Sequence, residues 1–343
     1  MNLHSNQQRK VWIDILKGIG ILTVVAGHIG NILPPQFGLL RMPLFLFVAG
    51  YLYKIHIDRR VYLHKKVVHL LVPYICFLVF LYIPQAVMSV KHGHETVAEA
   101  VMKGLLGGQL LVGRAGVFWF ITCLFITQQI TNYLLTKYSD KTVGIIMSIL
   151  LFLSFLSSEL LPDLWLPWSL NSVLAAAPIF FTGYLFKKHP LNFKGFQYLL
   201  LIGVIIVSLN VSNNVYNMKS NNFGIPFLTF ISAIVAIISL IPIAQWLVKS
   251  VFAATTFSTI SKGSMIIMYL HQPVQFLLKG IFPTHNSLLL LIAVFVICLG
   301  TYFVLRRSSY ARGLLLGSYK DFQKIFSGKI KHHPLEPSAQ VSS

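Results

Sequence analysis

The sequence predicts an all-α integral membrane protein, a polytopic bundle of about ten transmembrane helices with the N- and C-termini in the cytoplasm. Three observations support this prediction. Of the 343 residues, 55% are hydrophobic and only 11% are charged, whereas soluble domains carry about 25% charged residues. Mean hydropathy is +0.72. Long apolar runs alternate with short basic loops throughout the chain, which is the pattern of a multi-pass membrane protein.

The apolar runs define the individual spans. A helix that crosses a bilayer needs about 20 mainly apolar residues, and ten segments approach that length. The first follows a polar stretch and exceeds the ~7–15 apolar residues of a signal peptide, so we expect it to be retained as a span. The second is short, and the sixth contains Pro178. The expected spans are residues 11–32, 38–54, 67–90, 116–136, 142–161, 171–187, 196–212, 224–248, 263–282 and 287–306.

The distribution of positive charge orients these spans. With the N-terminus in the cytoplasm, 21 of the 28 lysines and arginines fall on the cytoplasmic side and six on the opposite side, while Lys17 lies inside a span. Such a bias is typical of membrane orientation. The formal net charge of +19 is therefore explained without nucleic acid, and we expect no nucleic-acid partner. The six outer residues are Arg41, Lys91, Lys103, Arg114, Lys219 and Lys279.

The chain is expected to form a transmembrane domain over residues 1–306 and a basic, partly disordered cytoplasmic tail over 307–343. The longest outer connection, residues 91–115, is polar and rich in glycine, and we expect it to fold over the outer mouth. The three cysteines lie in apolar runs without metal-ligand spacing, so they are interpreted as small buried hydrophobes and no metal site is predicted.

Three ionisable residues interrupt the first span, whose central sequence is DILKGIGILTVVAGH. Lys17 and His28 are eleven residues apart, close to three helical turns, so they share a face at about 16 Å along the axis. Asp14 joins this face one turn earlier. An ionisable residue inside an apolar span costs roughly 2.5 kcal/mol or more, and its default interpretation is functional.

Two further polar residues belong to this region. Arg41 starts the second span on the same outer side as His28, and His271 is the only other histidine well inside an apolar segment. A lone membrane histidine is also a common helix–helix hydrogen-bond partner, and that alternative stays open for His271. Of the nine acidic residues, only Asp14 lies clearly inside a span. Coupled transporters place carboxylates near the bilayer midplane, so this distribution argues against one.

The same stretches resemble a known family. KGIGILTVVAGH followed by RMPLFLFVAGYLY resembles the opening signature of the membrane-bound acyltransferase-3 family, and within it the chain looks most like the fucose 4-O-acetylase-related O-acetyltransferases. Further matches are HKKVVHLLVPY at 64–74, VFWFITCLF at 117–125 and SMIIMYLHQPV at 264–274. The resemblance implies an acyltransferase that moves an acyl group, usually acetyl, from cytoplasmic acyl-CoA to a carbohydrate hydroxyl.

The resemblance also assigns residues. The basic residue of the family signature corresponds to Lys17, where many members have arginine, and the essential histidine corresponds to His28. The family's Arg-x-x-Arg after the second span has its nearest counterpart in Lys66-x-x-His69. We expect the coenzyme phosphates to be held by Lys17, Lys65, Lys66 and His69. The hydrolase-like domain of longer members has no counterpart, so all the chemistry is expected in the membrane core.

The resulting hypothesis for catalysis centres on His28, as general base or as transient acyl carrier, with Lys17, Asp14 and Arg41. Asp14 is expected either to pair with Lys17 or to stabilise the start of a helix. Candidate contacts to the oxyanion or acceptor are His271, Arg114 and Trp119.

The expected function is that of an O-acetyltransferase of O-antigen, capsule or exopolysaccharide in a bacterial inner (plasma) membrane. Acetyl-CoA or another acyl-CoA is its co-substrate, no cofactor is permanently bound, and the partners are membrane lipids and a carbohydrate acceptor, free or lipid-linked. Three alternatives stay open: a transporter or flippase of a lipid-linked sugar or small solute, an O-succinyltransferase, and an acyltransferase acting on lipid or peptidoglycan.

Overall fold

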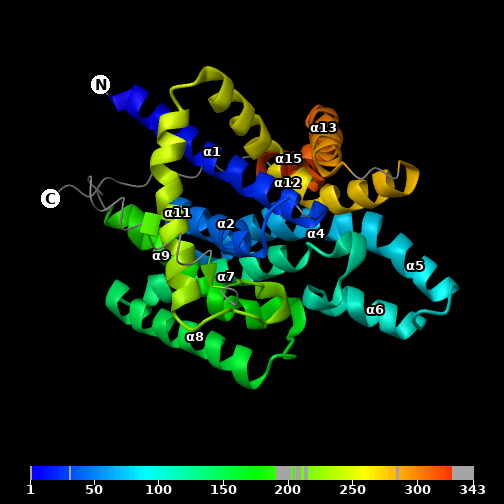
Figure 1. Ribbon diagram of the computed structural model, residues 1–343, viewed down its shortest axis with the longest axis horizontal. Helices are drawn as coiled ribbons and strands as arrows, with labels where there is room; N and C mark the ends of the chain where they lie inside the picture. The colour runs from blue at the N-terminus through cyan, green and yellow to red at the C-terminus, as the bar shows by residue number, and fades with distance from the viewer. Residues whose placement is uncertain are drawn as a thin grey trace.

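The computed structural model describes residues 2–30, 32–190, 215–282 and 286–326, together with 202, 203, 205, 210 and 211, and it describes side chains from residue 11 onward. Within these ranges the chain is helical, and its single β pairing is an isolated bridge between Asn217 and Asn222. The predicted all-α fold is confirmed (Figure 1).

The described residues form α-helices and shorter 3₁₀ or π segments. The α-helices are α1 (Asn2–Ile29), α2 (Gly38–Leu52), α3 (Arg59–Lys66), α4 (Val72–Phe77), α5 (Ile83–Lys91), α6 (Val97–Leu106), α7 (Trp119–Lys137), α8 (Asp140–Leu160), α9 (Leu170–Lys188), α11 (Leu228–Leu247), α12 (Val251–Ile281), α13 (Ser287–Leu305), α14 (Ser309–Leu314) and α15 (Tyr319–Phe326). Shorter 3₁₀ or π segments are η1 (Pro35–Phe37), η2 (Val67–Leu71), η3 (Leu78–Tyr82), η4 (Gly108–Leu110), η5 (Gly113–Ala115), η6 (Pro167–Ser169) and η7 (Met218–Ser220).

Eight helices in the described part of the chain are long and apolar enough to cross a membrane. They correspond to eight of the ten expected spans, including the short second one, and α9 continues through Pro178. The third is longer than expected, because α3, η2, α4, η3 and α5 form one helix over Arg59–Lys91. The expected span at 196–212 lies mostly outside the described residues. The chain is therefore a multi-pass membrane protein.

The expected span at 116–136 forms α7, which is 19 residues long but is not among those eight helices. Polar side chains lower its hydropathy, and they are buried in the bundle instead of facing lipid. They are Thr122, Thr127, Gln128, Thr131 and Asn132. Polar residues inside a membrane protein normally face the bundle interior, so α7 is an internal helix with a polar face.

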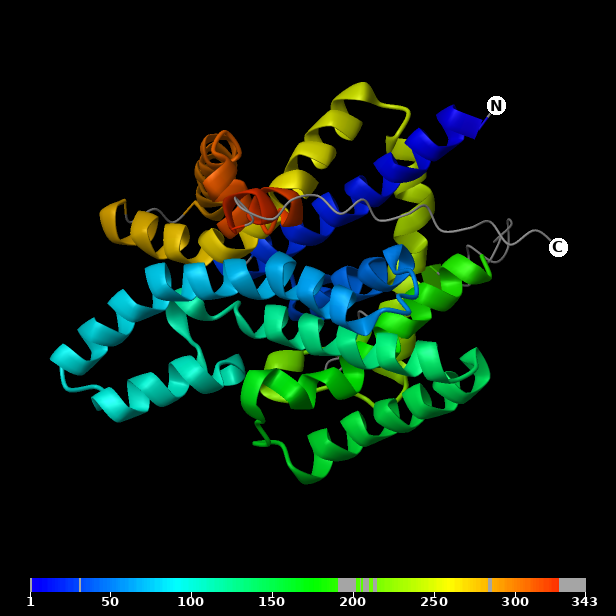
Figure 2. The ribbon, with the colours of Figure 1, turned by 180° about the vertical axis from the view of Figure 1, so that it is seen from behind.

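The centre of the bundle is α1, which packs against α12, α2 and α11, while α2 also packs against α9 (Figures 1 and 2). Glycines set the closest approach. A Cβ on Gly50 would lie 1.8 Å from the carbonyl oxygen of Phe180, and one on Gly183 would lie 2.0 Å from that of Phe47. The backbones of α2 and α9 therefore touch, as small residues allow in membrane bundles.

The expected outer connection contains α6, which forms a helical hairpin with α5, the end of the third span; the hairpin projects from the bundle in both views (Figures 1 and 2). Thr96 and Glu99 form a capping box that starts α6, and Lys103 pairs with Glu95 at 2.6 Å. The chain then turns at Gly107 and Gly108, both with φ of +59°. The segment after this turn returns to the bundle, and part of it lines a cavity described below.

The start of the expected tail is folded. Helices α14 and α15 form a hairpin closed by Arg312 and Asp321, whose side chains are 2.9 Å apart. Gly317, between the two helices, has a φ of +64°, and a Cβ there would lie 2.4 Å from the carbonyl oxygen of His69. Residues 309–326 therefore pack against η2, and the rest of the tail lies outside the described residues. Cys123 and Cys298 are buried as expected, but Cys76 is only partly so.

Candidate active site

Two separate cavities lie beside α1. The first, here called the Lys17 cavity, has a volume of 380 Å³, and the second, the His28 cavity, has a volume of 400 Å³. The polar residues of the Lys17 cavity are Lys17, Tyr53, Lys54, His56, Tyr62, Lys66, His69, Gln128 and Ser264. The polar residues of the His28 cavity are His28, Arg41, Trp119, Tyr216, Asn217, Lys219 and Gln272.

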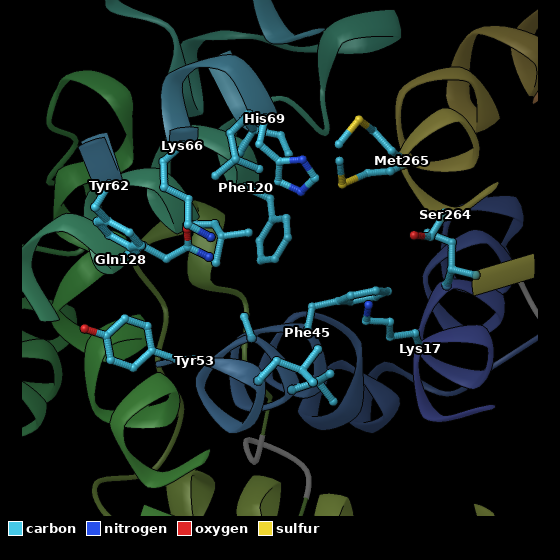
Figure 3. A pocket seen from close by; sticks show the side chains of 18 of the residues that line it. Lys17, Phe45, Tyr53, Tyr62, Lys66, His69, Phe120, Gln128, Ser264 and Met265 are labelled. Carbon is cyan, nitrogen blue, oxygen red and sulfur yellow. The ribbon is translucent and has the colours of Figure 1, made fainter. Parts of the chain in front are cut away.

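The Lys17 cavity is cationic. Lys17, Lys54 and Lys66 line it together with two histidines, and no carboxylate is among its lining residues. Figure 3 shows Lys17 and Ser264 on one side of the cavity, and Lys66 and Gln128 on the other. Lysines act as point charges for phosphate groups. This cavity is therefore suited to a ligand with several negative charges.

Lys66, at the end of α3, and His69, in the π segment η2 that follows, both line this cavity. Lys66 Nζ lies 5.4 Å from the centre of the Tyr62 ring, within the range of a cation–π contact. The Nδ1 atom of His69 is 3.1 Å from the carbonyl oxygen of Gly317. A carbonyl only accepts hydrogen bonds, so this contact places the proton on Nδ1 and leaves Nε2 as the acceptor. Lys65 is exposed and is not a lining residue, so three of the four predicted coenzyme ligands come together.

His28 lies at the end of α1, exposed to the His28 cavity. Its Nδ1 atom is 2.8 Å from the carbonyl oxygen of Val24, one turn earlier. The same reasoning places a proton on Nδ1 and leaves the lone pair of Nε2 free. A neutral imidazole with a free Nε2 is the form that accepts a proton from a hydroxyl group.

His271 lies behind His28 and not in the cavity. It is fully buried on α12, and its Nε2 is 3.3 Å from Nδ1 of His28. Its own Nδ1 is 2.9 Å from the carbonyl oxygen of Ile267. One turn further on, Gln275 donates to the carbonyl oxygen of His28 at 2.9 Å. Helix α12 thus holds both the ring and the backbone of His28, and His271 acts on the site through His28.

Arg41 enters the His28 cavity from α2, and its guanidinium occupies the space beside Gly27. A Cβ on Gly27 would lie only 2.1 Å from Cζ of Arg41. The absence of a side chain at position 27 therefore allows the guanidinium to lie against α1, one residue before His28. Trp119 also lines this cavity, whereas Arg114 is exposed and is not a lining residue. The structure brings together His28, Arg41 and Trp119.

Aromatic side chains separate the two cavities. Met42 and Trp119 line the His28 cavity, while Phe45 and Phe120, from the same two segments, line the Lys17 cavity. The rings of Phe45 and Phe120 meet edge to face with centroids 6.2 Å apart. We call this pair the aromatic layer. Both rings belong to the wall of the Lys17 cavity.

The family assignment follows from a comparison of sequences. A family model described as an acyltransferase domain, that of the acyltransferase-3 family, matches residues 10–307. The chain belongs to the acyltransferase-3 family. This membrane acyltransferase has no match among curated proteins and none among solved structures. The matched region contains both cavities, whereas α14 and α15 of the acyltransferase lie beyond it.

Asp14 has a different partner from the one expected. Its carboxylate accepts hydrogen bonds from Ser261 at 2.9 Å and from Ser258 at 3.5 Å, both on α12. The described residues form three ion pairs within 4.0 Å, and Asp14 with Lys17 is not one of them. Neither expected role is seen: there is no ion pair with Lys17 within that distance, and α1 begins at Asn2, so Asp14 is not at a helix start. Helical spacing defines a shared face, but it does not reveal whether the partner of a side chain lies on the same helix or on the next one. In this acyltransferase Asp14 fixes α1 to α12.

Sequence reasoning also missed a cluster that shapes the Lys17 cavity. Asn132, buried on α7, accepts from the Tyr53 hydroxyl and from the backbone N–H of His56, and it donates to the His56 carbonyl at 3.1 Å. These contacts hold the loop after α2 at the cavity. Burial, followed by the charges of nearby lysines, lowers the pKa of His56. Asn132 could have been suspected only from its position in an expected span.

Proposed function

We propose that this membrane acyltransferase transfers an acetyl group from acetyl-CoA to a sugar hydroxyl of a cell-surface polysaccharide, or of its lipid-linked precursor, in a bacterial inner membrane. One observation carries the proposal. A cationic cavity and a cavity with an unoccupied histidine Nε2 lie along the same helix, separated by one aromatic layer. The arrangement suits a donor and an acceptor that approach from opposite sides of the membrane.

The Lys17 cavity is the proposed donor site. It lies on the face that the charge distribution assigns to the cytoplasm, where acyl-CoA is made. Lys17, Lys54 and Lys66 would neutralise the phosphates of the coenzyme. Its narrow arm would lie along the apolar lining, which includes Phe45 and Phe120, and would carry the thioester towards the aromatic layer.

The His28 cavity is the proposed site of chemistry. Nε2 of His28 would accept the hydroxyl proton while the hydroxyl oxygen forms a bond to the thioester carbonyl carbon. The carbon–sulfur bond then breaks, and the proton on Nε2 passes to the departing thiolate. Arg41, held beside His28, would stabilise the oxyanion of the tetrahedral intermediate. In the covalent variant, Nε2 attacks the thioester carbonyl first and the CoA thiolate leaves as the carbon–sulfur bond breaks. The acetyl group then rests on the imidazole until the hydroxyl oxygen displaces it, and the hydroxyl proton passes to the freed Nε2 or to solvent.

Substitution of His28 tests this assignment. We expect His28→Ala to reduce transfer of labelled acetyl groups by ~10²–10⁴-fold, the usual contribution of a general base. Acetylated glycan and released CoA are measured in membranes that contain equal amounts of protein. His92→Ala is the matched control, because His92 makes the same contact to a carbonyl one turn earlier, at 2.6 Å, but lines neither cavity.

Two results would contradict the proposal. Normal acetylation by correctly inserted His28→Ala protein would show that this histidine is not catalytic. Release of no CoA by the wild-type protein, together with no label on any acceptor, would favour a transporter. Ping-pong kinetics would select the covalent variant of the mechanism.

A further inference from the structure

A second cation faces the His28 cavity, and sequence reasoning gave it no role. Lys219 lies in η7, in the polar segment that also places Tyr216 and Asn217 at the cavity. Its Nζ donates to the carbonyl oxygens of Leu111 at 2.7 Å and Gly116 at 2.9 Å. A lysine ammonium has three N–H donors, so these contacts leave one for a ligand.

The two cations of this cavity have no counter-charge in the described part of the chain. The lining residues include no carboxylate, and neither Lys219 nor Arg41 takes part in any of the three ion pairs. The Nε atom of Arg41 is buried without a hydrogen-bond partner. Charges withdrawn from water are costly unless they are paired. Their retention at a cavity wall indicates that a negatively charged ligand completes the site.

The two cations differ in position. Arg41 is held against Gly27, one residue before His28, where the reacting carbonyl would lie. Lys219 is fixed instead to the Gly-rich segment through Leu111 and Gly116. A contact from this separate segment can reach a different part of the acceptor from the part that Arg41 contacts. Lys219 is therefore placed to recognise the acceptor, and Arg41 to assist the reaction.

We propose that the His28 cavity selects an acceptor bearing an anionic group, a carboxylate or a phosphate, and that Lys219 binds this group. The inference rests on the proposed function, because it assumes that the acceptor occupies this cavity. A uronic acid would supply a carboxylate, and a sugar still linked to its lipid carrier would supply a phosphate. Both offer oxygen acceptors for the remaining N–H of Lys219.

The charge of Lys219 also makes the proposal sensitive to pH. Burial lowers the pKa of Lys219 to about 8, so it is mostly protonated at neutral pH and loses its charge as the pH rises through that value. Burial raises the pKa of Tyr216, which therefore stays neutral over this range. The other charged or titratable groups of the cavity are Arg41 and His28. The preference for an anionic acceptor should thus decline between pH 7 and 9.

Binding of three related sugars tests the proposal. Glucose, glucuronate and glucose 1-phosphate are titrated calorimetrically into the full-length protein in lipid nanodiscs without acyl-CoA. We expect one of the two anions to bind about tenfold to a hundredfold more tightly than glucose, the size of a contact to a charged group. Lys219→Met should abolish this preference and Lys219→Arg should retain it. The control Lys279→Met, exposed near the end of α12, should leave it unchanged.

The outcomes are distinct. Preference for glucuronate indicates an acidic sugar, and preference for glucose 1-phosphate indicates a phosphate-linked acceptor. Equal binding of all three sugars, or no binding of any, overturns the proposal. Lys219→Met could fail to fold if Lys219 serves only to tie the two segments together. In that case the wild-type protein is titrated at pH 7 and pH 9, and an anion preference that does not weaken at pH 9 overturns the proposal. Acetyl transfer is measured separately, so an anion preference without transfer would refute the proposed function while the anion site remained.

Discussion

Replacing Gly27 with alanine should disable catalysis without replacing a catalytic side chain. The added Cβ would lie 2.1 Å from Cζ and 2.5 Å from Nε of Arg41. Carbon atoms in contact are normally about 3.5–4.0 Å apart, so the guanidinium would have to withdraw by roughly 1.5 Å. The far end of an arginine moves more easily than a backbone, so we expect Arg41 to leave its position while α1 stays in place.

The expected loss is about hundredfold in kcat. Misplacing a reacting or stabilising group by ~1 Å costs about 10²-fold, and removing a donor to the oxyanion costs ~10²–10³-fold. Stability should not fall in parallel, because alanine favours a helix over glycine by about 1 kcal/mol. A protein that melts at the same temperature or higher, yet is nearly inactive, is the expected result.

The assay is CoA release from acetyl-CoA by purified Gly27→Ala, Arg41→Ala and the double variant. If Gly27 acts only by making room for Arg41, the double variant should be no slower than Arg41→Ala alone. Gly300→Ala on α13 is the control, since a Cβ there meets nothing within 4 Å. Wild-type kcat in Gly27→Ala, or effects that multiply in the double variant, would refute the reasoning.

Two further predictions concern the Lys17 cavity. Lys66→Met should raise the KM for acetyl-CoA about tenfold, as expected for a contact to a charged group, whereas Lys65→Met, which removes the exposed neighbouring lysine, should change it less than twofold; equal effects would indicate general surface charge. Gly317→Ala should also raise the KM for acetyl-CoA and leave the KM for the acceptor unchanged. A Cβ at this position, where φ is +64°, would lie 2.4 Å from the His69 carbonyl oxygen and would push α14 and α15 away from His69. A rise in both KM values, or in neither, would show that this hairpin has no specific effect on the donor site.

Much of the fold followed from hydropathy, and the departures have physical causes. Spans that face lipid are apolar throughout, so their number and order could be predicted. Helix α7 is different because its polar residues contact other helices, and its low hydropathy reflects burial in protein instead of exposure to water. The hairpin of α14 and α15 was missed because its basic composition resembles that of a free tail. Its packing depends on Gly317 meeting His69, a contact between residues far apart in sequence.

The parts of the site that depend on spacing along one helix could be predicted from the sequence. Lys17 and His28 were expected on one face of α1, and each lines a cavity of its own. Spacing along one helix does not reveal what the next helix presents. The serines that hold Asp14 and the histidine that holds His28 all come from α12. The sequence did not indicate a functional role for Lys219, because a lysine in a polar outer loop is normally solvated. Only the return of the Gly-rich segment brings it to His28.

The aromatic layer has a consequence for the energetics of the membrane itself. Under the proposed function the two cavities open to opposite sides of the membrane, so most of the transmembrane voltage would fall across the aromatic layer and the protein around it. Moving one elementary charge through it would involve about 2.3 kcal/mol per 100 mV. In the proposed transfer the acetyl group moves outward while the hydroxyl proton moves inward to the thiol, so neutral groups give neutral products and no net charge crosses the layer. Under the proposed function, the enzyme could therefore acetylate outer sugars in an energised cell without working against the membrane voltage.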